Sequence, residues 1–446
     1  MLVAQHSSSQ LLQMIVDAKR CTSSHQIVFV ISPQSIASFS AAVLDQENYA
    51  AMAVKFASWL GPEKCDNLYH MQVRVKSFIK QLLTRAVKPL ELMLIDSSIG
   101  RDIALQESCL EFDQRIQDYP LLCGICPGFV CYAEKSYEGD LEADKNSFSL
   151  LRHLSRVRSP QQIVASLVKT QLKSPYTLIS VMPCFDKKLE ASRAQFCDPK
   201  PEVDLVLGTN EFLQYLQDVP LEDAIGEVDD LSSKLNLGSE MNWWSECYRH
   251  GGTRSGGYLH SVFCHASAKM GLAIAGDEVA SDEKVLVRNL ANKDIQEFIL
   301  FQDKQTRDDA EKFLSETVTR SFYRNLCRQK PALPKACLVF LLATGFRNIQ
   351  NMVTEMKRSW KKRQSCLDQD DPLFDYAEVM ACPSGCINGG AQLKSTNSNL
   401  VNNVYDSSRR IMESKVNYNR DDQSAFTTDY KHVPKIEIIR SSSLAW

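Results

Sequence analysis

The stretch "YAEVMACPSGCINGGAQ", residues 376–392, decides the fold. Its first part, YAEVMA (376–381), has the length and composition of a buried strand and leads directly to Cys382 and Cys386. Pro and Gly residues around these cysteines favour a tight turn. Amide N–H groups in such a turn can hydrogen-bond to sulfur and stabilise a thiolate. The stretch therefore predicts part of a metal site whose other ligands lie elsewhere in the chain.

Apolar runs of strand length alternate with amphipathic stretches of helical period along most of the sequence. Strands are expected over QIVFVI (26–31), LELMLI (90–95), YTLISVM (176–182), EVDLVL (202–207) and YAEVMA (376–381), and helices over 35–44, 101–117, 159–173 and 345–358. Ser159 is the expected N-cap of the third helix, with Pro160 at its first position. This alternation predicts an α/β fold with mostly parallel sheets, in which ligands gather beyond the carboxyl ends of the strands.

Three stretches lack these signals. Residues 61–85 and 301–335 are polar and mixed in charge, and we interpret them as insertions or peripheral helices. From residue 394 to about residue 420 the chain is rich in Ser, Asn, Asp and Arg, which predicts a surface linker or a mobile segment.

The overall composition excludes several classes of protein. Lys and Arg total 51 against 54 Asp and Glu, a net charge near −3, so no nucleic-acid partner is expected. No secretory signal is recognisable, and the longest apolar stretch, ACLVFLLATGF (336–346), is shorter than the roughly 20 residues of a membrane helix. We expect a soluble intracellular protein with reduced thiols, in which cysteine motifs indicate metal or catalysis and most of the 15 cysteines are small buried hydrophobes.

Three cysteine motifs stand out, each beside Pro or Gly: CGICPGFVCYAEK (123–135), VMPCFDKKLE (181–190) and EVMACPSGCINGGAQ (378–392). Taken singly, each is a weak signal. Cys123 and Cys126 could be a thioredoxin-like redox pair, but the proline follows the second cysteine and no helix is expected to begin there. Cys184 alone is typical of a core residue. The pair in the third motif could be half of a zinc site, but no partner CxxC lies at zinc-finger spacing.

In combination, the three motifs resemble, in the same order, the signature motifs of iron-only hydrogenases and their eukaryotic relatives. Three further segments, VRSPQQIVASLVK (157–169), GGTRSGGYLHSVF (251–263) and GFRNIQNM (345–352), fit the eukaryotic branch more closely. That branch contains cytosolic iron–sulfur cluster assembly factors and nuclear prelamin A recognition factors. The resemblance spans roughly residues 25 to 392, and TTDYKHV (427–433) resembles the family more weakly.

The resemblance implies a two-lobed, iron-only hydrogenase-like α/β fold with mostly parallel sheets, flanking helices and a cluster between the lobes. Residues 1–24 would be an N-terminal remnant, 25–175 the first lobe with the first cysteine motif, and 176–392 the second lobe with the other two motifs. Residues 393–446 would form a C-terminal segment with a linker and a tail.

The resemblance also implies a ligand set: Cys126, Cys184, Cys382 and Cys386 would bind one [4Fe–4S] cluster, for which four thiolates are the usual complement. In hydrogenases the residue at the position of Cys386 also bridges to a two-iron subsite. Lys187 and Glu190 stand where hydrogenases place a lysine and a glutamate near that subsite; a solvated ion pair at the start of a helix is the alternative.

Two departures from the hydrogenase pattern bear on activity. Hydrogenases carry a proton-relaying cysteine immediately before the first ligand, and this chain has Ile125 there, which cannot carry a proton. Cys123 lies two residues further back and is not expected to substitute. Gly389, Gly390 and Ala391 stand where hydrogenases have three glycines, a change that still permits a tight turn. We therefore expect no enzyme activity.

A further departure concerns the N-terminus. The assembly-factor branch opens with one cysteine and a CxxCxxC run that bind an additional [4Fe–4S] cluster, and this chain shows no such run. A second cluster is therefore in doubt, and Cys21 and Cys65 are expected to be structural. A truncated sequence, an alternative start or a divergent paralogue would each account for the difference.

These observations predict a component of the cytosolic iron–sulfur protein assembly machinery that aids the maturation of extramitochondrial iron–sulfur proteins. A hydrogenase-type oxidoreductase and a cluster-free nuclear or lamin-related interaction protein are the alternatives. The expected partners are other assembly factors and apoprotein clients, with no membrane and no nucleic acid.

Three further segments bear on partners and on the site. The terminal Trp446 either anchors in a partner's pocket or packs onto its own domain. The basic run KRSWKKR (357–363) is either a solvated helix end or a nuclear-import patch, so the expected location is cytoplasmic with a nuclear alternative. The stretch GGTRSGGY (251–258) lacks the patterns of nucleotide-binding loops, and we expect a loop that approaches the site.

Overall fold

The computed structural model describes most of the chain. The described residues are 8–20, 25–115, 120–136, 148–197, 200–221, 241, 243–272, 274, 279–316, 320–330, 332–365, 372–394, 399–411, 416–418, 420 and 423–430. The predictions made for Cys21 and Trp446 lie outside these residues.

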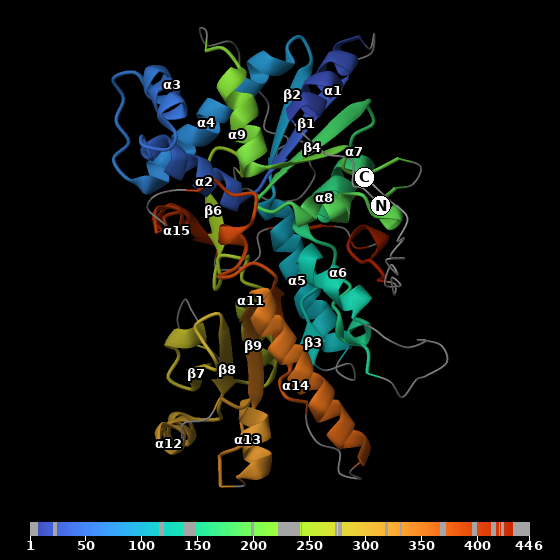
Figure 1. Ribbon diagram of the computed structural model, residues 1–446, viewed down its shortest axis with the longest axis vertical. Coiled ribbons are helices and arrows are strands. Elements are labelled where there is room, and N and C mark those ends of the chain that lie inside the picture. The colour runs from blue at the N-terminus through green and yellow to red at the C-terminus, as the bar shows by residue number, and fades with distance from the viewer. Residues whose placement is uncertain are drawn as a thin grey trace, which may run out of the picture.

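A four-stranded, wholly parallel sheet forms the core of the upper half of the molecule in Figure 1. Its strands are β1 (Gln26–Ile31), β2 (Glu91–Asp96), β4 (Tyr176–Met182) and β5 (Leu205–Gly208), in the order β2-β1-β4-β5. In the register of the sheet, Val28 of β1 pairs with Met93 on one side and Leu178 on the other. We call this sheet and the helices that cover it the β1 lobe. The apolar runs predicted to be strands at 26–31, 90–95 and 176–182 are all present, and the run at 202–207 contributes the shorter β5.

Helices cover both faces of this sheet because successive residues of a strand point to opposite faces. Ile27, Phe29 and Ile31 pack into one core cluster, and Val28 and Val30 pack into the other. On the first face lie α1 (Ser8–Arg20), α2 (Pro33–Leu44), α3 (Ala50–Leu60), α4 (Leu68–Val87) and α9 (Thr209–Asp218), and on the second α5 (Ser98–Gln114) and α7 (Pro160–Gln171).

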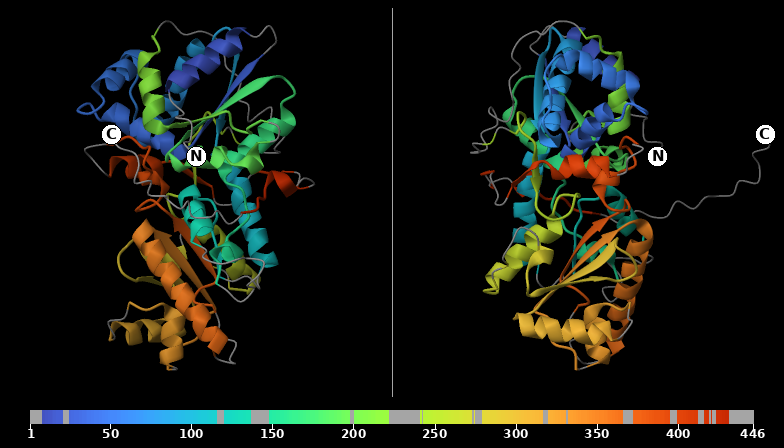
Figure 2. Two further views of the ribbon diagram at one scale, coloured as in Figure 1. Left: turned by 45° about the vertical axis from the view of Figure 1, so that its right-hand side comes forward. Right: turned by 90° about the vertical axis from the view of Figure 1, so that its left-hand side faces the viewer.

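A second, five-stranded sheet lies in the lower half of the molecule (Figures 1 and 2). Its strands are β3 (Leu121–Leu122), β7 (Val285–Asn289), β8 (Ile295–Leu300), β9 (Leu338–Thr344) and β10 (Tyr376–Met380), in the order β3-β10-β9-β8-β7. β3, β10 and β9 are parallel, whereas β8 and β7 run antiparallel at one edge. The helices α11 (Tyr258–Lys269) and α14 (Phe346–Ser365) pack against it. We call this sheet and its helices the β10 lobe. The α/β fold with mostly parallel sheets is thus confirmed, and the antiparallel edge was not predicted.

The strand order crosses the lobe boundary expected at residue 175. β4 and β5 follow that boundary in the sequence but pair with β1, while β3 precedes it and pairs with β10. Parallel pairing needs long crossover connections, so neighbouring strands come from distant parts of the chain. Each sheet therefore draws strands from both sides of the expected boundary.

The helix α4 occupies most of the stretch 61–85 that was interpreted as an insertion or peripheral helix. It is not peripheral, because Phe78 and Leu82 are buried in the core of the β1 lobe. Lys76 is 1% exposed, and its ammonium group lies 2.6 Å from the Asp96 carboxylate at the end of β2. It also donates to the backbone carbonyls of Trp243 and Glu246, at 2.9 and 2.6 Å. This buried ion pair ties α4 to the end of β2.

The other predicted insertion, 301–335, contains α12 (Lys304–Ser315) and α13 (Tyr323–Gln329). α12 fits the interpretation as a peripheral helix, since Ala310 is its one buried residue. α13 buries Tyr323 and Leu326 and is part of the core of the β10 lobe.

The stretch 394–420, predicted to be a linker, is partly folded. Residues 399–411 contain α15 (Leu400–Asp406) and β11 (Arg409–Ile411), and β11 pairs in parallel with β6 (Tyr248–His250). The linker prediction is wrong here, because Val404 and Tyr405 of α15 are buried against α2. The apolar residues of α15 gave too weak a signal because they stand among many Asn and Ser residues; they are Leu400, Val401, Val404 and Tyr405.

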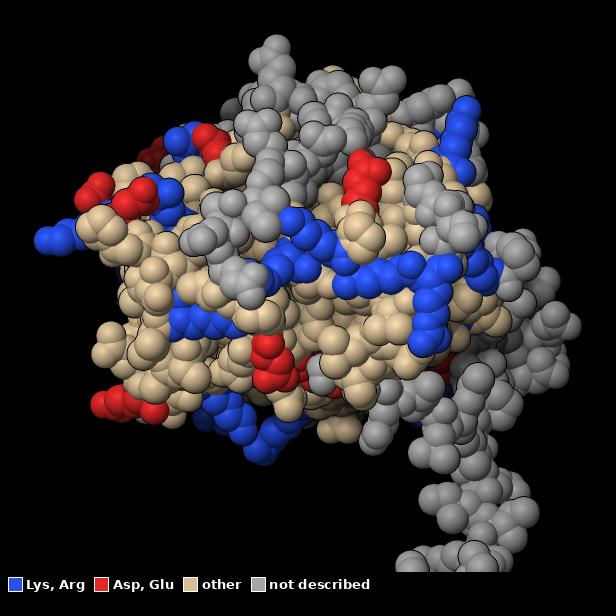
Figure 3. Space-filling model, turned by 90° about the horizontal axis from the view of Figure 1, so that it is seen from above, with Lys and Arg blue, Asp and Glu red and all other residues tan. Residues whose placement is uncertain are grey.

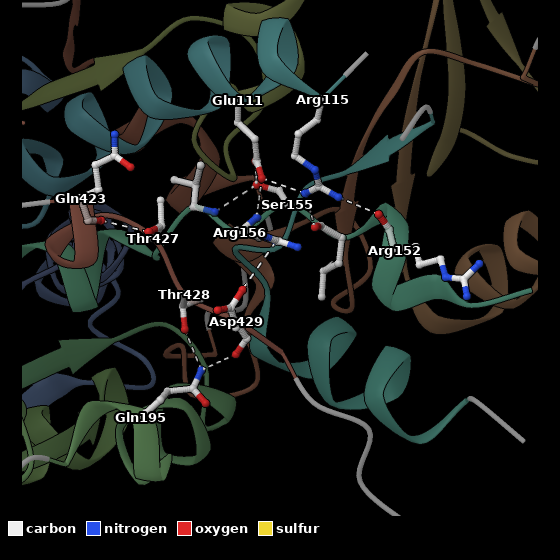
Figure 4. A network of polar contacts seen from close by, with 12 residues as sticks. Glu111, Arg115, Arg152, Ser155, Arg156, Gln195, Gln423, Thr427, Thr428 and Asp429 are labelled. Atoms are coloured by element: carbon white, nitrogen blue, oxygen red, sulfur yellow. Dashed lines mark hydrogen bonds and ion pairs between the residues drawn. The ribbon is translucent and has the colours of Figure 1, made fainter. Parts of the chain in front are cut away.

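The described C-terminal residues 423–430 lie against the stretch that precedes α7 (Figure 4). Thr427 forms an antiparallel bridge with Val157, and the Thr428 amide donates to the Arg156 carbonyl at 2.7 Å. Tyr430 reaches the first cysteine motif, where its hydroxyl donates to the Gly124 carbonyl at 3.3 Å. The stretch 427–433, which weakly resembles the family, therefore contacts the first cysteine motif through Tyr430.

Figure 4 also shows the contacts that hold residues 155 and 156 against α5. Glu111 of α5 accepts hydrogen bonds from the Ser155 hydroxyl, from the Arg156 amide at 2.8 Å and from the Arg115 guanidinium at 2.9 Å (Figure 4).

Within the described ranges, no helix combines the length and apolar character required to cross a bilayer.

Candidate metal centre

The three cysteine motifs meet at the junction of the two sheets. Cys126 follows β3 and precedes α6 (Pro127–Lys135), Cys184 follows β4 and precedes α8 (Asp186–Ala191), and Cys382 follows β10. Each motif thus stands at the carboxyl end of a parallel strand, where α/β folds place their ligands. One cavity, with an empty volume of about 650 Å³ that includes open solvent, is lined by Cys126, Cys184, Cys382 and Cys386 together.

Glycines allow the motifs to approach one another closely. A Cβ on Gly389 would lie 2.1 Å from the Pro183 carbonyl oxygen, and the amide of Ala391 donates to that oxygen at 3.0 Å. A Cβ on Gly128 would lie 2.7 Å from a carboxylate oxygen of Asp186. The first and third motifs therefore both pack directly onto the second, and there is no space for a side chain at either contact.

The third motif also contacts the loop 251–258. Gly385 has a φ of +87°, and a Cβ there would lie 2.2 Å from the Ser255 hydroxyl oxygen. That oxygen accepts the Cys386 amide at 2.9 Å. The expectation that this loop approaches the site is confirmed, since Ser255 and Tyr258 both line the cavity.

Backbone amides point at two of the sulfur atoms. The Ala381 amide donates to Cys126 Sγ at 3.3 Å, and the Gly390 backbone donates to the sulfur of Cys382. Such bonds stabilise a thiolate and tune a bound metal.

Burial dominates the acid–base behaviour of these cysteines. It raises the pKa of all four thiols, that of Cys382 to about 11 and that of Cys386 to about 12, and neighbouring cysteine sulfurs raise the pKa of Cys184, Cys382 and Cys386 further. Each pKa is raised because an isolated thiolate is poorly solvated there. A bound metal supplies the positive charge that favours the thiolate.

The donor set fits an iron–sulfur cluster better than a single metal ion. Among the described residues, no group of three or more His, Cys, Asp or Glu side chains could hold one metal ion. In a [4Fe–4S] cluster each thiolate binds a different iron, so the sulfur atoms stand farther apart than around a zinc ion. Four cysteines around one cavity provide the number and kind of ligand that the cluster needs.

Ile125 lines the cavity and is 6% exposed, whereas the buried Cys123 is not among the lining residues. The residue that replaces the relay cysteine therefore faces the site. One argument against a redox pair here was wrong, because a helix, α6, does begin at Pro127. Pro127 occupies its first position, where a missing N–H costs nothing.

The interpretation of Lys187 and Glu190 as a solvated ion pair is wrong. Both are buried, at 8 and 7% exposure, and the Lys187 ammonium group lies 2.9 Å from the Glu190 carboxylate. That carboxylate also accepts the Ser159 hydroxyl at 2.8 Å. Ser159 is the N-cap residue of α7, as predicted, but its hydroxyl binds Glu190 and makes no capping bond.

The cavity also has residues to which the sequence assigned no role, Arg101 among them, while Tyr258 belongs to the loop that was expected to approach the site. Arg101 of α5 and Tyr258 of α11 line the wall formed by the ends of β1 and β2 and by the loop 251–258. Lys and Arg side chains also form a band across the face seen from above in Figure 3. That face belongs to the β1 lobe, whereas the cavity lies at the junction of the lobes, so the band is not part of the site.

Comparison with known proteins identifies the class of this fold and site. The profile of the family described as "Iron only hydrogenase large subunit, C-terminal domain" matches residues 68–390. An apo [FeFe]-hydrogenase from Chlamydomonas reinhardtii shares the fold, with a TM-score of 0.57 at 16% identity over 96% of this chain and 99% of that one. The chain belongs to this iron-only hydrogenase-like family.

Its relatives at higher identity carry a different description. The cytosolic Fe-S cluster assembly factor narfl of Xenopus tropicalis is 33% identical over 414 residues, covering 88% of this chain and 68% of the relative. The zebrafish (Danio rerio) protein of the same name is 32% identical and covered to 79%. The cytosolic iron-sulfur assembly component 3 of Mus musculus is 32% identical and covered to 68%.

Proposed function

We propose that this chain is a component of the cytosolic iron–sulfur protein assembly machinery and binds one [4Fe–4S] cluster through Cys126, Cys184, Cys382 and Cys386. The observation that carries the proposal is that these four cysteines, from three distant motifs, line one cavity. The names of the relatives, as cytosolic Fe-S cluster assembly factors, support the assembly role.

The residues of the chain have distinct tasks in this proposal. The four thiolates hold the cluster, which when bound supplies iron and sulfide or an electron for the maturation of client proteins. The amides of Ala381 and Gly390 stabilise the thiolates of Cys126 and Cys382. Burial of the motifs limits access of water to the sulfur atoms.

We further propose that the protein is not an enzyme. Ile125 lines the cavity where a hydrogenase has its relay cysteine, and an alkyl side chain neither accepts nor donates a proton. Other assembly factors and apoprotein clients in the cytoplasm are the proposed partners. A second, N-terminal cluster is not part of the proposal, because the sequence has no CxxCxxC run that would bind it.

Iron and sulfide analysis of the anaerobically purified chain, with electron paramagnetic resonance (EPR), tests this proposal. We expect about four irons and four sulfides per chain. Cys184→Ser is expected to lose most of this iron, because one of the four ligands is removed. Cys131→Ser is the matched control: Cys131 lies on α6, is half-buried and does not line the cavity, so its iron content should equal that of the wild type.

The alternatives give different results in the same experiment. About six irons, or any evolution of hydrogen, would instead support a hydrogenase-type oxidoreductase with a two-iron subsite. Complete absence of iron would support a cluster-free interaction protein. Equal iron in the Cys184→Ser and Cys131→Ser proteins would refute the ligand assignment.

A further inference from the structure

The cavity has a polar wall that the cysteine motifs do not form. Arg101 and Tyr258 both line this wall, in the same cavity as Cys386. Neither residue is needed as a ligand, because the four cysteines already complete the set.

Arg101 is a buried cation that forms no ion pair among the described residues, although the carboxylates of Asp96 and Glu378 lie near enough to interact with it electrostatically. It is 4% exposed, and its guanidinium donates to two neutral groups, Gln34 Oε1 at 2.9 Å and the Tyr405 hydroxyl at 3.3 Å. Its Nε has no partner among the described residues, and no described carboxylate forms an ion pair with it. A buried charge of this kind is costly unless a counter-charge is present.

Tyr258 contributes a second unsatisfied group to the same wall. It is fully buried, and its hydroxyl has no hydrogen-bond partner in the part of the chain that the structure describes. The loop 251–258 packs closely against Arg101, since a Cβ on Gly256 would lie 3.0 Å from Arg101 Nε. A buried donor left unpaired costs the free energy of its desolvation. Two residues that line one cavity therefore each carry a buried donor without an acceptor among the described residues.

The charges around the cavity identify that acceptor. Besides Arg101, the charged residues in the lining are Lys187 and Asp186, and Lys187 is neutralised by Glu190 at 2.9 Å. A dicationic [4Fe–4S] core with four thiolates is a dianion, and one-electron reduction adds a further negative charge. Arg101 is the cation of the described lining that remains free to balance this charge.

We propose that Arg101, assisted by the Tyr258 hydroxyl, is the counter-charge of the cluster and makes its reduced state accessible, so that this centre accepts an electron. The inference rests on the proposed function above. In the reduction, one electron passes from a one-electron reductant to the cluster, and no bond or proton is transferred. The positive charge stabilises the more negative state more strongly, which raises the reduction potential.

A redox titration of the anaerobically purified full chain, followed by EPR with dithionite as reductant, tests the proposal. Arg101→Gln is expected to lower the equilibrium constant for reduction at least tenfold, a shift of about 59 mV to more negative potential. Tyr258→Phe should shift the potential in the same direction by less, because it removes a dipole and not a charge. Arg101→Lys should lie between wild type and Arg101→Gln, since it keeps the charge but not the planar fork.

Arg254→Gln is the matched control. Arg254 lies on the same loop as Gly256, but its side chain is 42% exposed and pairs with Asp406, so solvent screens its charge from the cavity. Its potential should equal that of the wild type.

Iron content, measured first in every variant, separates failure of the inference from failure of the proposed function. A wild type without iron refutes the proposed function. A wild-type cluster that dithionite does not reduce, or iron-replete Arg101→Gln and Tyr258→Phe proteins with the wild-type potential, overturns the inference.

Two further readouts keep the test decisive. Where Arg101→Gln does not fold, Tyr258→Phe decides. Its hydroxyl has no described partner to lose, so the cluster-free variant should be at least as stable to urea as the wild type. Calorimetry measures thiocyanate binding to the cluster-free wild type. If Arg101→Gln loses this binding but its reduction potential equals that of the wild type, the partner of Arg101 is a free anion, which also overturns the proposal.

Discussion

Gly389→Ala is expected to abolish cluster binding, whereas Gly390→Ala is expected to leave it intact. The two glycines are neighbours in the third motif, but a Cβ on Gly389 would lie 2.1 Å from the Pro183 carbonyl oxygen, while nothing lies within 4 Å of one on Gly390. Pro183 immediately precedes Cys184, so the added methyl group must push the second and third motifs apart. Four ligands from three motifs cannot then meet around one cluster.

The measurement is iron per chain in the two variants, purified side by side without oxygen. Gly389→Ala should retain less than about one quarter of the wild-type iron, and it should lose about 1–3 kcal/mol of stability through overpacking. Gly390→Ala should match the wild type in both respects. Equal iron in the two proteins would show that the close contact at Gly389 does not hold the motifs in place.

Asp96→Asn is expected to lower the free energy of unfolding by about 3–5 kcal/mol, because it leaves the Lys76 ammonium group buried without a counter-charge. The two side chains are 2% and 1% exposed, so water cannot replace the lost partner. Asparagine keeps an oxygen that can accept the Ser98 amide, which Asp96 accepts at 2.9 Å. The expected loss of stability therefore measures the missing charge of the Lys76–Asp96 pair and not a change in the turn at the start of α5.

Urea unfolding of the cluster-free protein measures this effect. Replacing both partners, Lys76→Met with Asp96→Asn, should recover most of the stability, since no unpaired charge then remains. Asp113→Asn is the matched control: Asp113 pairs with Lys269 and His265, whose side chains are 57% and 29% exposed, and its loss should cost less than about 1 kcal/mol. Similar unfolding midpoints for Asp96→Asn and Asp113→Asn would contradict the assigned role of the buried pair.

The central strands could be predicted from the sequence because they are buried on both faces and read as unbroken apolar runs. QIVFVI (26–31) became β1 with the same bounds. The hairpin of β7 and β8 was missed because its strands, VLVRN and IQEFIL, combine apolar residues with polar ones such as Arg288 and Glu297 and show neither an unbroken apolar run nor a regular alternation. Which strands share a sheet was also beyond the sequence, since pairing depends on contacts between distant residues.

The candidate site divides in a similar way. That Cys184 and Cys382 stand at the carboxyl ends of strands could be predicted, because both follow expected strands. That these strands belong to two sheets whose ends meet, and that the short β3 precedes Cys126, could not. Arg101 could not be recognised, because an arginine on an amphipathic helix is usually exposed. Nothing local indicates that the pair of Lys187 and Glu190 is buried, since its burial depends on Ser159 and Gln161 of α7.

The spacing of the cysteine motifs along the chain also has a consequence for synthesis. Two of the cavity cysteines, Cys126 and Cys184, leave the ribosome long before Cys382 and Cys386. At roughly 5–20 residues per second, the intervening stretch of roughly 200 residues takes about 10–40 seconds to translate. During that interval the nascent polypeptide exposes two thiols whose companions do not yet exist. If the four cysteines bind one cluster, as proposed, all four can be loaded only after translation or in the last moments of elongation.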